Sequence, residues 1–229
     1  MISVIVPTHN EEKRIGGTME KLQNYLDSAG IDYEVMVADD GTDRTAEIVS
    51  KFGARNKGIK LIHFNRRLGK WGAILEAVKQ ARGDALIYDA DASVPPAEIG
   101  KVVVALKEFD VVVGSRNLEG ARVESGFLRR VYGRLFNLLV RVLFGLKIGD
   151  TQCGFKAARK KVWEKIGSRI LTTGFAGDVE FLVKAKKFGF SVKEIPVKWR
   201  HVGGGPFQKS TLKNALKMFR EVIELKLRG

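Results

Sequence analysis

The stretch Asp84-Ala85-Leu86-Ile87-Tyr88-Asp89-Ala90-Asp91 joins a short apolar run to two aspartates one residue apart. The apolar run predicts a buried strand over residues 85–88, and the aspartates follow where that strand ends. On a continuing strand Asp89 and Asp91 would point to opposite faces, but where the chain turns both can reach one ligand. Two anionic oxygen groups at the carboxyl edge of a sheet suit a hard divalent cation that carries substrate phosphates. A solvated turn is the alternative interpretation of this pair taken alone.

On both sides of this stretch, predicted strands alternate with predicted helices, which is typical of an α/β fold with a mostly parallel sheet and right-handed crossovers. The predicted strands are residues 3–6, 33–38, 60–64, 85–88, 110–114 and 192–197. The predicted helices are residues 15–29, 44–52, 71–81, 97–108, 127–146, 178–188 and 211–227. We expect Thr42 or Asp43 to cap the second helix, and residues 203–206 to form a glycine-rich loop.

Three of the predicted strand ends carry acidic or amide clusters, at residues 7–12, 39–43 and 89–91. Turn chemistry explains any one of them, because Asn, Asp and Gly also fill loops. In open parallel sheets, however, ligands bind outside the carboxyl ends of the strands, so three such clusters favour one shared site. Residues 66–72, Arg-Arg-Leu-Gly-Lys-Trp-Gly, add cations and glycines before a helix, where phosphate can bind.

Composition and charge narrow the classes of function. The 229 residues hold one cysteine, Cys153, which excludes an internal disulfide and favours a reducing compartment. We expect no signal peptide and no ordinary transmembrane helix, because residues 1–7 are too short a leader and no apolar run reaches 18 residues. Residues 1–115 hold 15 basic and 17 acidic residues, whereas residues 116–229 hold 25 and 9. A basic second half favours a surface that faces nucleic acid, or anionic lipid and phosphate.

A set of ordered motifs resembles those of the inverting GT-A glycosyltransferases of family 2, and within them the dolichyl-phosphate hexose synthases. The matching segments are residues 4–12, 37–42, 69–72, 89–91, 114–116, 150–156 and 175–180. Each motif is weak alone, but the set covers the chain in family order from the first strand to about residue 200. The resemblance implies one GT-A domain over residues 1–229, with a Rossmann-like mostly parallel sheet flanked by helices. Residues 1–115 would form its nucleotide-sugar-binding half, and the basic residues 116–229, ending in an amphipathic helix, its acceptor-binding and membrane-facing half.

The resemblance also implies roles for individual residues. Asp89 and Asp91 would hold Mg²⁺ or Mn²⁺ against the donor diphosphate, and Asp178 falls where the wider family often has a general base. A phosphate acceptor is already largely ionised near neutral pH, so it needs little deprotonation. The nucleotide sugar would contact a set of residues that the motifs supply: Pro7, Thr8, Asn10, Glu11, Val37, Asp39, Lys70 and Asp89. The acceptor phosphate would contact three arginines, since guanidinium groups suit phosphate oxygens: Arg116, Arg130 and Arg134.

His201 is a further candidate for the donor diphosphate, because it lies beside Trp199 and before the glycine-rich loop. The implied activity is the transfer of one hexose from a nucleotide sugar to dolichyl or polyprenyl phosphate. Ala92-Ser93 and residues 150–156 resemble the glucosyl-transferring branch, so UDP-glucose is favoured over GDP-mannose. We expect the enzyme to be cytoplasmic and peripherally membrane-associated, with basic amphipathic helices on an anionic membrane surface.

Alternative functions stay open at this point. A family 2 glycosyltransferase that uses a soluble or glycan acceptor would share the same motifs. A nucleic-acid-binding module would use the basic half and exposed aromatic side chains, but many aromatics here have core-like spacing, so we expect no nucleic-acid partner. A nucleotidyltransferase would also use paired aspartates, but it leaves the basic segment of residues 116–134 and the amphipathic helix unexplained.

Overall fold

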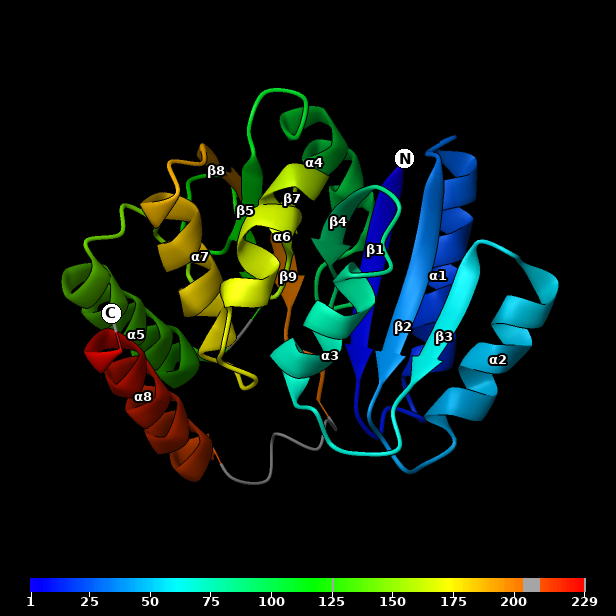
Figure 1. Ribbon diagram of the computed structural model, residues 1–229, viewed down its shortest axis with the longest axis horizontal. Helices are drawn as coiled ribbons and strands as arrows, with labels where there is room; N and C mark the ends of the chain where they lie inside the picture. The colour runs from blue at the N-terminus through cyan, green and yellow to red at the C-terminus, as the bar shows by residue number, and fades with distance from the viewer. Residues whose placement is uncertain (125, 204–210, 229) are drawn as a thin grey trace.

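The computed structural model describes residues 1–124, 126–203 and 211–228, and their side chains except those of 127–130 and 211–216. A seven-stranded sheet runs through it in the order β3-β2-β1-β4-β7-β5-β8, with helices on both faces (Figure 1). The strands are β1 (Ile2–Thr8), β2 (Tyr33–Asp39), β3 (Ile59–His63), β4 (Asp84–Ile87), β5 (Val111–Ser115), β7 (Lys156–Ala158) and β8 (Val192–Pro196). Neighbouring strands are parallel, except that β7 is antiparallel to β4 and β5. The predicted mostly parallel sheet is confirmed.

Two hydrophobic clusters hold the helices against the two faces of the sheet. Val4 and Val6 of β1 belong to one cluster and Ile5 to the other, because successive side chains of a strand point to opposite faces. The first cluster includes residues of α1 (Ile15–Ser28), α2 (Thr45–Arg55) and α4 (Ile99–Ala105). The second includes residues of α3 (Lys70–Val78), α6 (Lys160–Ile166) and α7 (Gly177–Lys187). Burial on both faces explains why the parallel strands are nearly continuous apolar runs.

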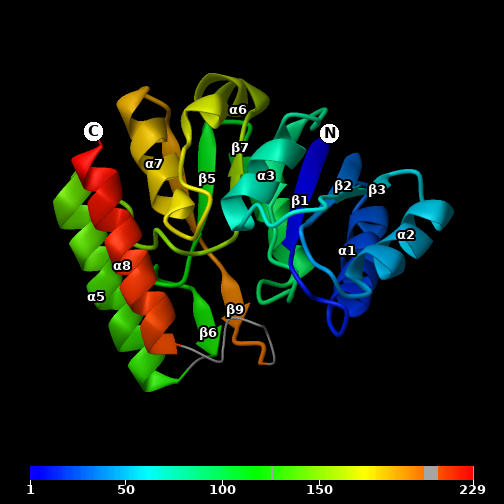
Figure 2. The same cartoon turned by 60° about the horizontal axis from the view of Figure 1, so that its bottom comes forward.

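Two long helices, α5 (Phe127–Phe144) and α8 (Thr211–Leu227), lie side by side at the β8 end of the molecule (Figures 1 and 2). Val140 of α5 and Val222 of α8 are fully buried and join the second cluster. Several other apolar side chains of α5 are exposed, including Tyr132 and Val142. The pair is therefore anchored to the body by one face, while another face of α5 stays open to solvent.

Some elements differ from the sequence-based prediction. The predicted strands of the sheet are present with shifts of one or two residues, but β7 and α6 were not predicted. A small second sheet, in which β6 (Arg122–Glu124) is parallel to β9 (Lys198–Arg200), was not predicted either. The predicted helix 97–108 is divided into a 3-10 turn (Pro96–Glu98) and α4, and a second 3-10 turn (Gly167–Arg169) follows α6. The predicted glycine-rich loop lies, from residue 204 on, outside the described residues.

The cap predicted for α2 is wrong by one or two residues. Arg44 stands at the cap position, and its side chain makes no capping hydrogen bond. Asp43 contributes one residue earlier, because its Oδ1 accepts a hydrogen bond from the backbone N–H of Thr45 at 2.9 Å.

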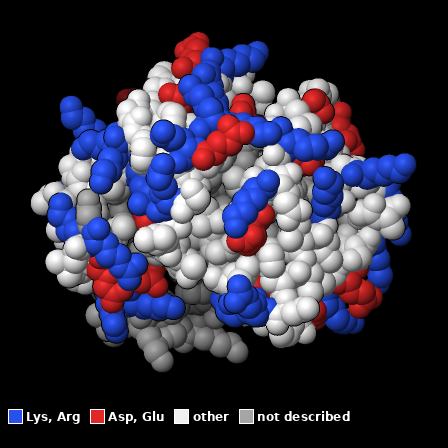
Figure 3. All heavy atoms as spheres, viewed as in Figure 1, with Lys and Arg blue, Asp and Glu red and all other residues white. Residues whose placement is uncertain are grey.

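Among the described residues, no helix combines the length and the apolarity that crossing a membrane requires. The surface is rich in basic side chains, and Figure 3 shows them spread over the α5–α8 side and over the β3 side of the same face. The basic surface that the charge of residues 116–229 predicts therefore does not appear as one continuous patch in this view.

Candidate active site

A cleft of about 320 Å³ opens at the carboxyl ends of the parallel strands. Its lining residues come from the ends of β1, β4 and β5 and the segments that follow them, and from the start of α3 and of α7. Most of the predicted site residues line it: Pro7, Thr8, Glu11, Lys70, Asp89, Asp91, Arg116, Asp178 and His201. The parallel sheet thus brings together side chains that are up to 194 positions apart, from Pro7 to His201.

The other predicted site residues lie elsewhere. Val37 does not contact the cleft, because its side chain on β2 is fully buried in the hydrophobic core. Asn10 is exposed beside the cleft, where its Oδ1 accepts a hydrogen bond from the backbone N–H of Thr42 at 2.8 Å. Arg134 is exposed on α5 and is not among the described residues that line the cleft. The side chain of Arg130 lies outside the described part of the chain.

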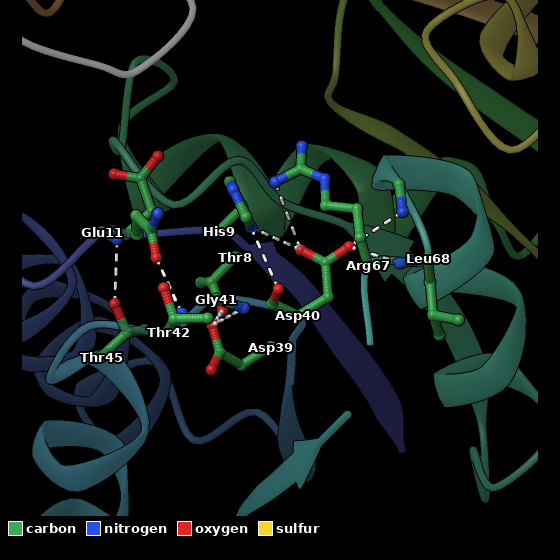
Figure 4. A network of polar contacts seen from close by, with 12 residues as sticks. Thr8, His9, Glu11, Asp39, Asp40, Gly41, Thr42, Thr45, Arg67 and Leu68 are labelled. Atoms are coloured by element: carbon green, nitrogen blue, oxygen red, sulfur yellow. Dashed lines mark hydrogen bonds and ion pairs between the residues drawn. The ribbon is translucent and has the colours of Figure 1, made fainter. Parts of the chain in front are cut away.

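Asp39 is held beneath the cleft by three partners, of which Figure 4 shows Thr8 and Gly41. The hydroxyl of Thr8 donates to its Oδ1 at 2.8 Å, and the backbone N–H of Gly41 approaches the same oxygen at 3.3 Å. The Nδ1 atom of His63 lies 2.9 Å from Oδ2. Asp39 itself is 1% exposed. Through its contacts with Thr8 and His63 it joins the ends of β1, β2 and β3, and it positions Thr8 at the cleft wall.

Asp40, which the sequence analysis did not single out, fixes the loop before α3 (Figure 4). Its Oδ2 accepts hydrogen bonds from the backbone N–H groups of Leu68 and Gly69, at 2.9 and 2.8 Å. Its Oδ1 lies 2.9 Å from Nδ1 of His9, a second cleft residue. Because Lys70 follows Gly69 directly, the hydrogen bonds of Leu68 and Gly69 to Asp40 determine where the Lys70 side chain enters the cleft.

The chain turns after Asp89 as predicted. Ala92 has φ +50°, in the left-handed region that L-residues rarely adopt, and the backbone N–H of Ser93 donates to Oδ1 of Asp91 at 2.9 Å. This turn places Asp89 and Asp91 on the same cleft.

Seven charged groups in and just beneath the cleft form a row that alternates in sign, with one exception. From one side, Lys156 pairs with Asp178, and Lys70 lies 3.9 Å from Asp178 and 3.0 Å from Asp89. From the other side, Arg14 donates to Glu11 at 2.6 Å and lies 3.9 Å from Asp91. The exception is the pair Asp89 and Asp91, which are neighbouring charges of the same sign. Three cations and four carboxylates leave this row one negative charge in excess.

Asp89 and Asp91 suit a divalent cation. Burial, and next the neighbouring charge of Asp89, raise the pKa of Asp91, because two close carboxylates of the same sign disfavour each other's ionisation. A bound cation would relieve their repulsion. No group of three or more His, Cys, Asp or Glu side chains in the described residues could hold a metal ion by itself. Two carboxylates, with substrate phosphate oxygens and water as the remaining ligands, are what Mg²⁺ commonly uses.

Lys70 keeps its charge in this environment. Burial alone would lower its pKa, but the charges of Asp89 and Asp178 outweigh burial and raise it. The pKa of Asp178 is lowered in turn, because the charges of Lys156 and Lys70 outweigh the effect of its burial. Both groups are therefore ionised at neutral pH.

Arg116 stands on the same cleft in a fixed orientation. Its Nε and Nη2 donate to Oδ2 and Oδ1 of Asp150, at 2.7 and 2.9 Å, in a bidentate pair. Asp150 is fully buried, and although burial opposes it, Arg116 holds the pKa of this carboxyl below its usual range. The guanidinium carbon of Arg116 lies 5.4 Å from the ring centroid of Trp199, which stacks on His201.

Several cleft residues were missed by sequence reasoning. Gln152 and Gly154 belong to the quoted motif 150–156, and Trp199 was noted only as a neighbour of His201. Arg14 carries no sequence signal that separates it from other basic residues at the start of a helix. Only the packing of α1 beside the turn after β4 brings Arg14 to the cleft.

Comparison with known proteins identifies the family of this chain. The family model described as "Glycosyl transferase family 2" matches residues 3–167. "Glycosyltransferase AglD" of Haloferax volcanii is 34% identical over 88% of this chain, which spans only 33% of that protein. "Dolichyl-phosphate beta-glucosyltransferase ALG5D" of Trichomonas vaginalis is 30% identical over 99% of this chain and 74% of its own length.

A solved structure agrees with the fold. The UDP complex of glucosyl-3-phosphoglycerate synthase from Mycobacterium tuberculosis superposes with a TM-score of 0.74 at 19% identity, covering 100% of this chain and 79% of that one. This likeness confirms the predicted GT-A fold. Because the family model covers most of the chain and ALG5D is matched over about three quarters of its length, the chain belongs to glycosyl transferase family 2, as its ordered motifs predicted.

Proposed function

We propose that this enzyme transfers one hexose from a nucleotide sugar to the phosphate of a polyprenyl or dolichyl phosphate, with UDP-glucose favoured over GDP-mannose as the donor. The observation that carries the proposal is one cleft that combines the carboxylate pair Asp89 and Asp91, the cation Lys70 and the fixed guanidinium of Arg116. Such a site offers partners to a donor diphosphate and to an acceptor phosphate together. Relatives named dolichyl-phosphate beta-glucosyltransferase support the choice of sugar and lipid.

The donor is proposed to bind at the carboxyl ends of β1 and β4. Pro7, Thr8 and Glu11 would contact the nucleoside, over the support that Asp39 gives to Thr8. Lys70 would face the diphosphate from the start of α3. Asp89 and Asp91 would hold Mg²⁺ or Mn²⁺, which when bound neutralises charge on the departing diphosphate.

The proposed reaction is a single displacement that inverts the anomeric carbon. An oxygen of the acceptor phosphate forms the new bond to that carbon as the bond to the nucleoside diphosphate breaks. The acceptor oxygen is already ionised near neutral pH, and Asp178 is paired with two lysines and has a lowered pKa, so it is a poor proton acceptor. Positioning and charge stabilisation then supply most of the rate acceleration.

The acceptor phosphate is proposed to meet Arg116. The bidentate bond to Asp150 and the contact with Trp199 fix the guanidinium in advance, which reduces the entropy lost when phosphate binds. Arg134 does not line the described cleft, so its predicted role at the acceptor phosphate would need the lipid to approach along α5.

Attachment to a membrane is proposed to use α5. Its exposed apolar side chains Val131, Leu135, Leu138 and Val142 recur at helical spacing and form one stripe. Arg134 and Arg141 are exposed along one edge of this stripe, where they could meet anionic headgroups. Peripheral attachment on the cytoplasmic face stays a prediction.

The experiment that tests the proposal is a transfer assay with purified polyprenyl phosphate, a panel of labelled UDP- and GDP-sugars, and Mg²⁺ or Mn²⁺. We expect an organic-extractable labelled product, with UDP-glucose as the best donor. A parallel arm with water-soluble phosphate esters addresses the soluble-acceptor alternative, because Arg116 could bind any phosphate. Transfer only to the soluble esters would refute the lipid acceptor, and a different preferred donor would correct the sugar.

A further inference from the structure

A lysine is buried under the floor of the cleft without touching it. Lys156 on β7 has a fully buried side chain, and its Nζ donates to Oδ1 of Asp178 at 2.7 Å and to the backbone carbonyl of Cys153. A buried ammonium group is costly unless it is paired and hydrogen-bonded. The family motifs explain neither this burial nor this pairing.

Its position in the sheet places Lys156 between the two ends of the proposed reaction. Lys156 pairs in register with Ile87 of β4 and with Val113 of β5. Asp89 follows two residues after Ile87, and Arg116 three residues after Val113. The antiparallel strand β7 therefore brings one cation beneath the cleft, between the strands that lead to Asp89 and to Arg116.

From Lys156 a row of contacts leads into the cleft. Asp178 presents Oδ1 to Lys156 and Oδ2 to Lys70, whose Nζ lies 3.9 Å from that oxygen. The same Nζ donates to Oδ1 of Asp89 at 3.0 Å. Lys70 is thus shared between two carboxylates, and the shorter contact is to the one at the proposed diphosphate site.

The sharing depends on the charge of Lys156. Asp178 is 1% exposed, so water screens its charge poorly and nearby cations must neutralise it. With Lys156 in place, Asp178 already has a close partner on its core side. Without Lys156, Lys70 would be the nearest remaining cation and would be drawn away from Asp89 toward Asp178.

We propose that Lys156 is a positioning residue for the donor diphosphate: it neutralises Asp178 from the core side and so leaves Lys70 directed at Asp89 and the phosphates. Asp178 is then the link between the two lysines and not a proton acceptor. The lowered pKa of Asp178 agrees with this assignment. The inference rests on the proposed function only in taking a nucleoside diphosphate as the group that Lys70 meets.

The test compares diphosphate with monophosphate binding by isothermal titration calorimetry in the presence of Mn²⁺. In Lys156→Met we expect UDP to bind about tenfold more weakly, because Lys70 would be drawn toward Asp178 and would lose its charged hydrogen bond to the diphosphate. The affinity for UMP should change by about twofold or less. Lys161→Met is the matched control, since Lys161 on α6 is exposed and pairs with Asp110 at 2.6 Å. It should bind both nucleotides as the wild type does. Equal losses for UDP and UMP in Lys156→Met would mean a merely structural role and overturn the proposal.

A second variant keeps the test valid if Lys156→Met does not fold. In Lys156→Met/Asp178→Asn the buried charge that needs Lys156 is gone, so Lys70 should stay at Asp89. We expect the double variant to bind UDP within about threefold of the wild type, and where Lys156→Met does fold, this recovery is the non-additivity of two residues that act as one unit. A double variant that binds UDP about tenfold or more weakly than wild type would overturn the proposal. The proposed function fails by a different result, a wild-type enzyme that binds neither UDP nor GDP or transfers no sugar to lipid phosphate.

Discussion

The backbone of Gly154 lies against the carboxylate of Asp89, so closely that a methyl group added at Gly154 would stand 2.0 Å from Oδ2 of Asp89. Gly154 comes just before β7 and Asp89 just after β4, so the antiparallel pairing of these strands brings the two residues together. A side chain at position 154 would have to displace the carboxylate. The position of one proposed metal ligand therefore depends on a glycine 65 residues away in the sequence.

Gly154→Ala should weaken nucleotide binding that depends on the metal. We expect about a tenfold loss of UDP affinity in Mn²⁺, because Asp89 can no longer keep its position, and a smaller loss in EDTA. Calorimetric titration under both conditions measures the difference. Gly167→Ala is the control, since an added methyl group there has nothing within 4 Å. Unchanged UDP affinity in Gly154→Ala would show that Asp89 is not needed where the structure places it.

Asp91→Asn should abolish transfer without unfolding the protein. We expect kcat to fall by about 100-fold or more, because the metal that stabilises the leaving diphosphate loses a ligand. The melting temperature in metal-free buffer should stay the same or rise, since the substitution removes the repulsion that raises the pKa of Asp91.

Steady-state kinetics and thermal unfolding check the two halves of this prediction about Asp91. Asp32→Asn is the charge-matched control, because the Asp32 side chain is 78% exposed and precedes β2, at the opposite end of that strand from the cleft. A folded Asp91→Asn enzyme with near-normal turnover at saturating donor would contradict the metal assignment.

Much of the fold could be predicted because parallel strands buried on both faces leave a strong local signal. The runs that became β1, β2 and β5 are nearly all apolar, and polar clusters mark where they end. By contrast, β7 has three residues, Lys156–Ala158, with no β-branched side chain. Its place between β4 and β5 is determined by tertiary pairing, which no local pattern of three residues can predict.

The site shows the same division between local and tertiary signals. Asp89, Asp91 and Lys70 could be predicted because each follows a strand or begins a helix at the carboxyl edge of the sheet. Val37 shares a motif with Asp39 and points to the same face of β2, but it lies inside the strand among core residues, whereas Asp39 ends the strand at the carboxyl edge of the sheet. The buried partner of Asp178, Lys156, could not be found without the packing of α7 on β7.

Asp150→Asn should destabilise the fold in a pH-dependent way. The pKa of Asp150 is lower in the folded chain than its usual value, so the ionised carboxylate stabilises the fold above about pH 4. This contribution is lost as the pH falls through the lowered pKa. We therefore expect the free energy of unfolding to drop by about 2–4 kcal/mol at pH 7, since one partner of a buried pair is neutralised.

Urea unfolding at pH 7 and at a series of pH values down to about 3 tests the Asp150 prediction, since the difference between variant and wild type should shrink below about pH 4. A difference that stays constant over this range would assign the loss to packing and not to the ion pair with Arg116.

Arg116→Lys should affect the acceptor more than the donor. Lysine keeps a positive charge beside Asp150 but loses the planar fork, so we expect the KM for polyprenyl phosphate to rise about tenfold. The Kd for UDP should change by about twofold or less. Kinetics with varied acceptor and calorimetry with UDP separate the two effects, and Arg122→Lys on the exposed strand β6 serves as the control. If the KM for polyprenyl phosphate and the Kd for UDP rise equally, Arg116 belongs to the donor site.

Leu138→Glu should weaken binding to anionic vesicles. Leu138 is 55% exposed in the middle of the apolar stripe of α5, so a carboxylate there opposes insertion without disturbing the core. Basic residues near an anionic surface contribute about 1 kcal/mol each, so wild-type binding should be stronger on anionic than on neutral vesicles and partly reversed by salt. Vesicle flotation measures both effects. Val104→Glu is the matched control, because Val104 is 64% exposed on α4, on the opposite face of the sheet. If both variants float like the wild type, α5 is not the docking helix, and a wild-type chain that fails to float on anionic vesicles at low salt favours the soluble acceptor.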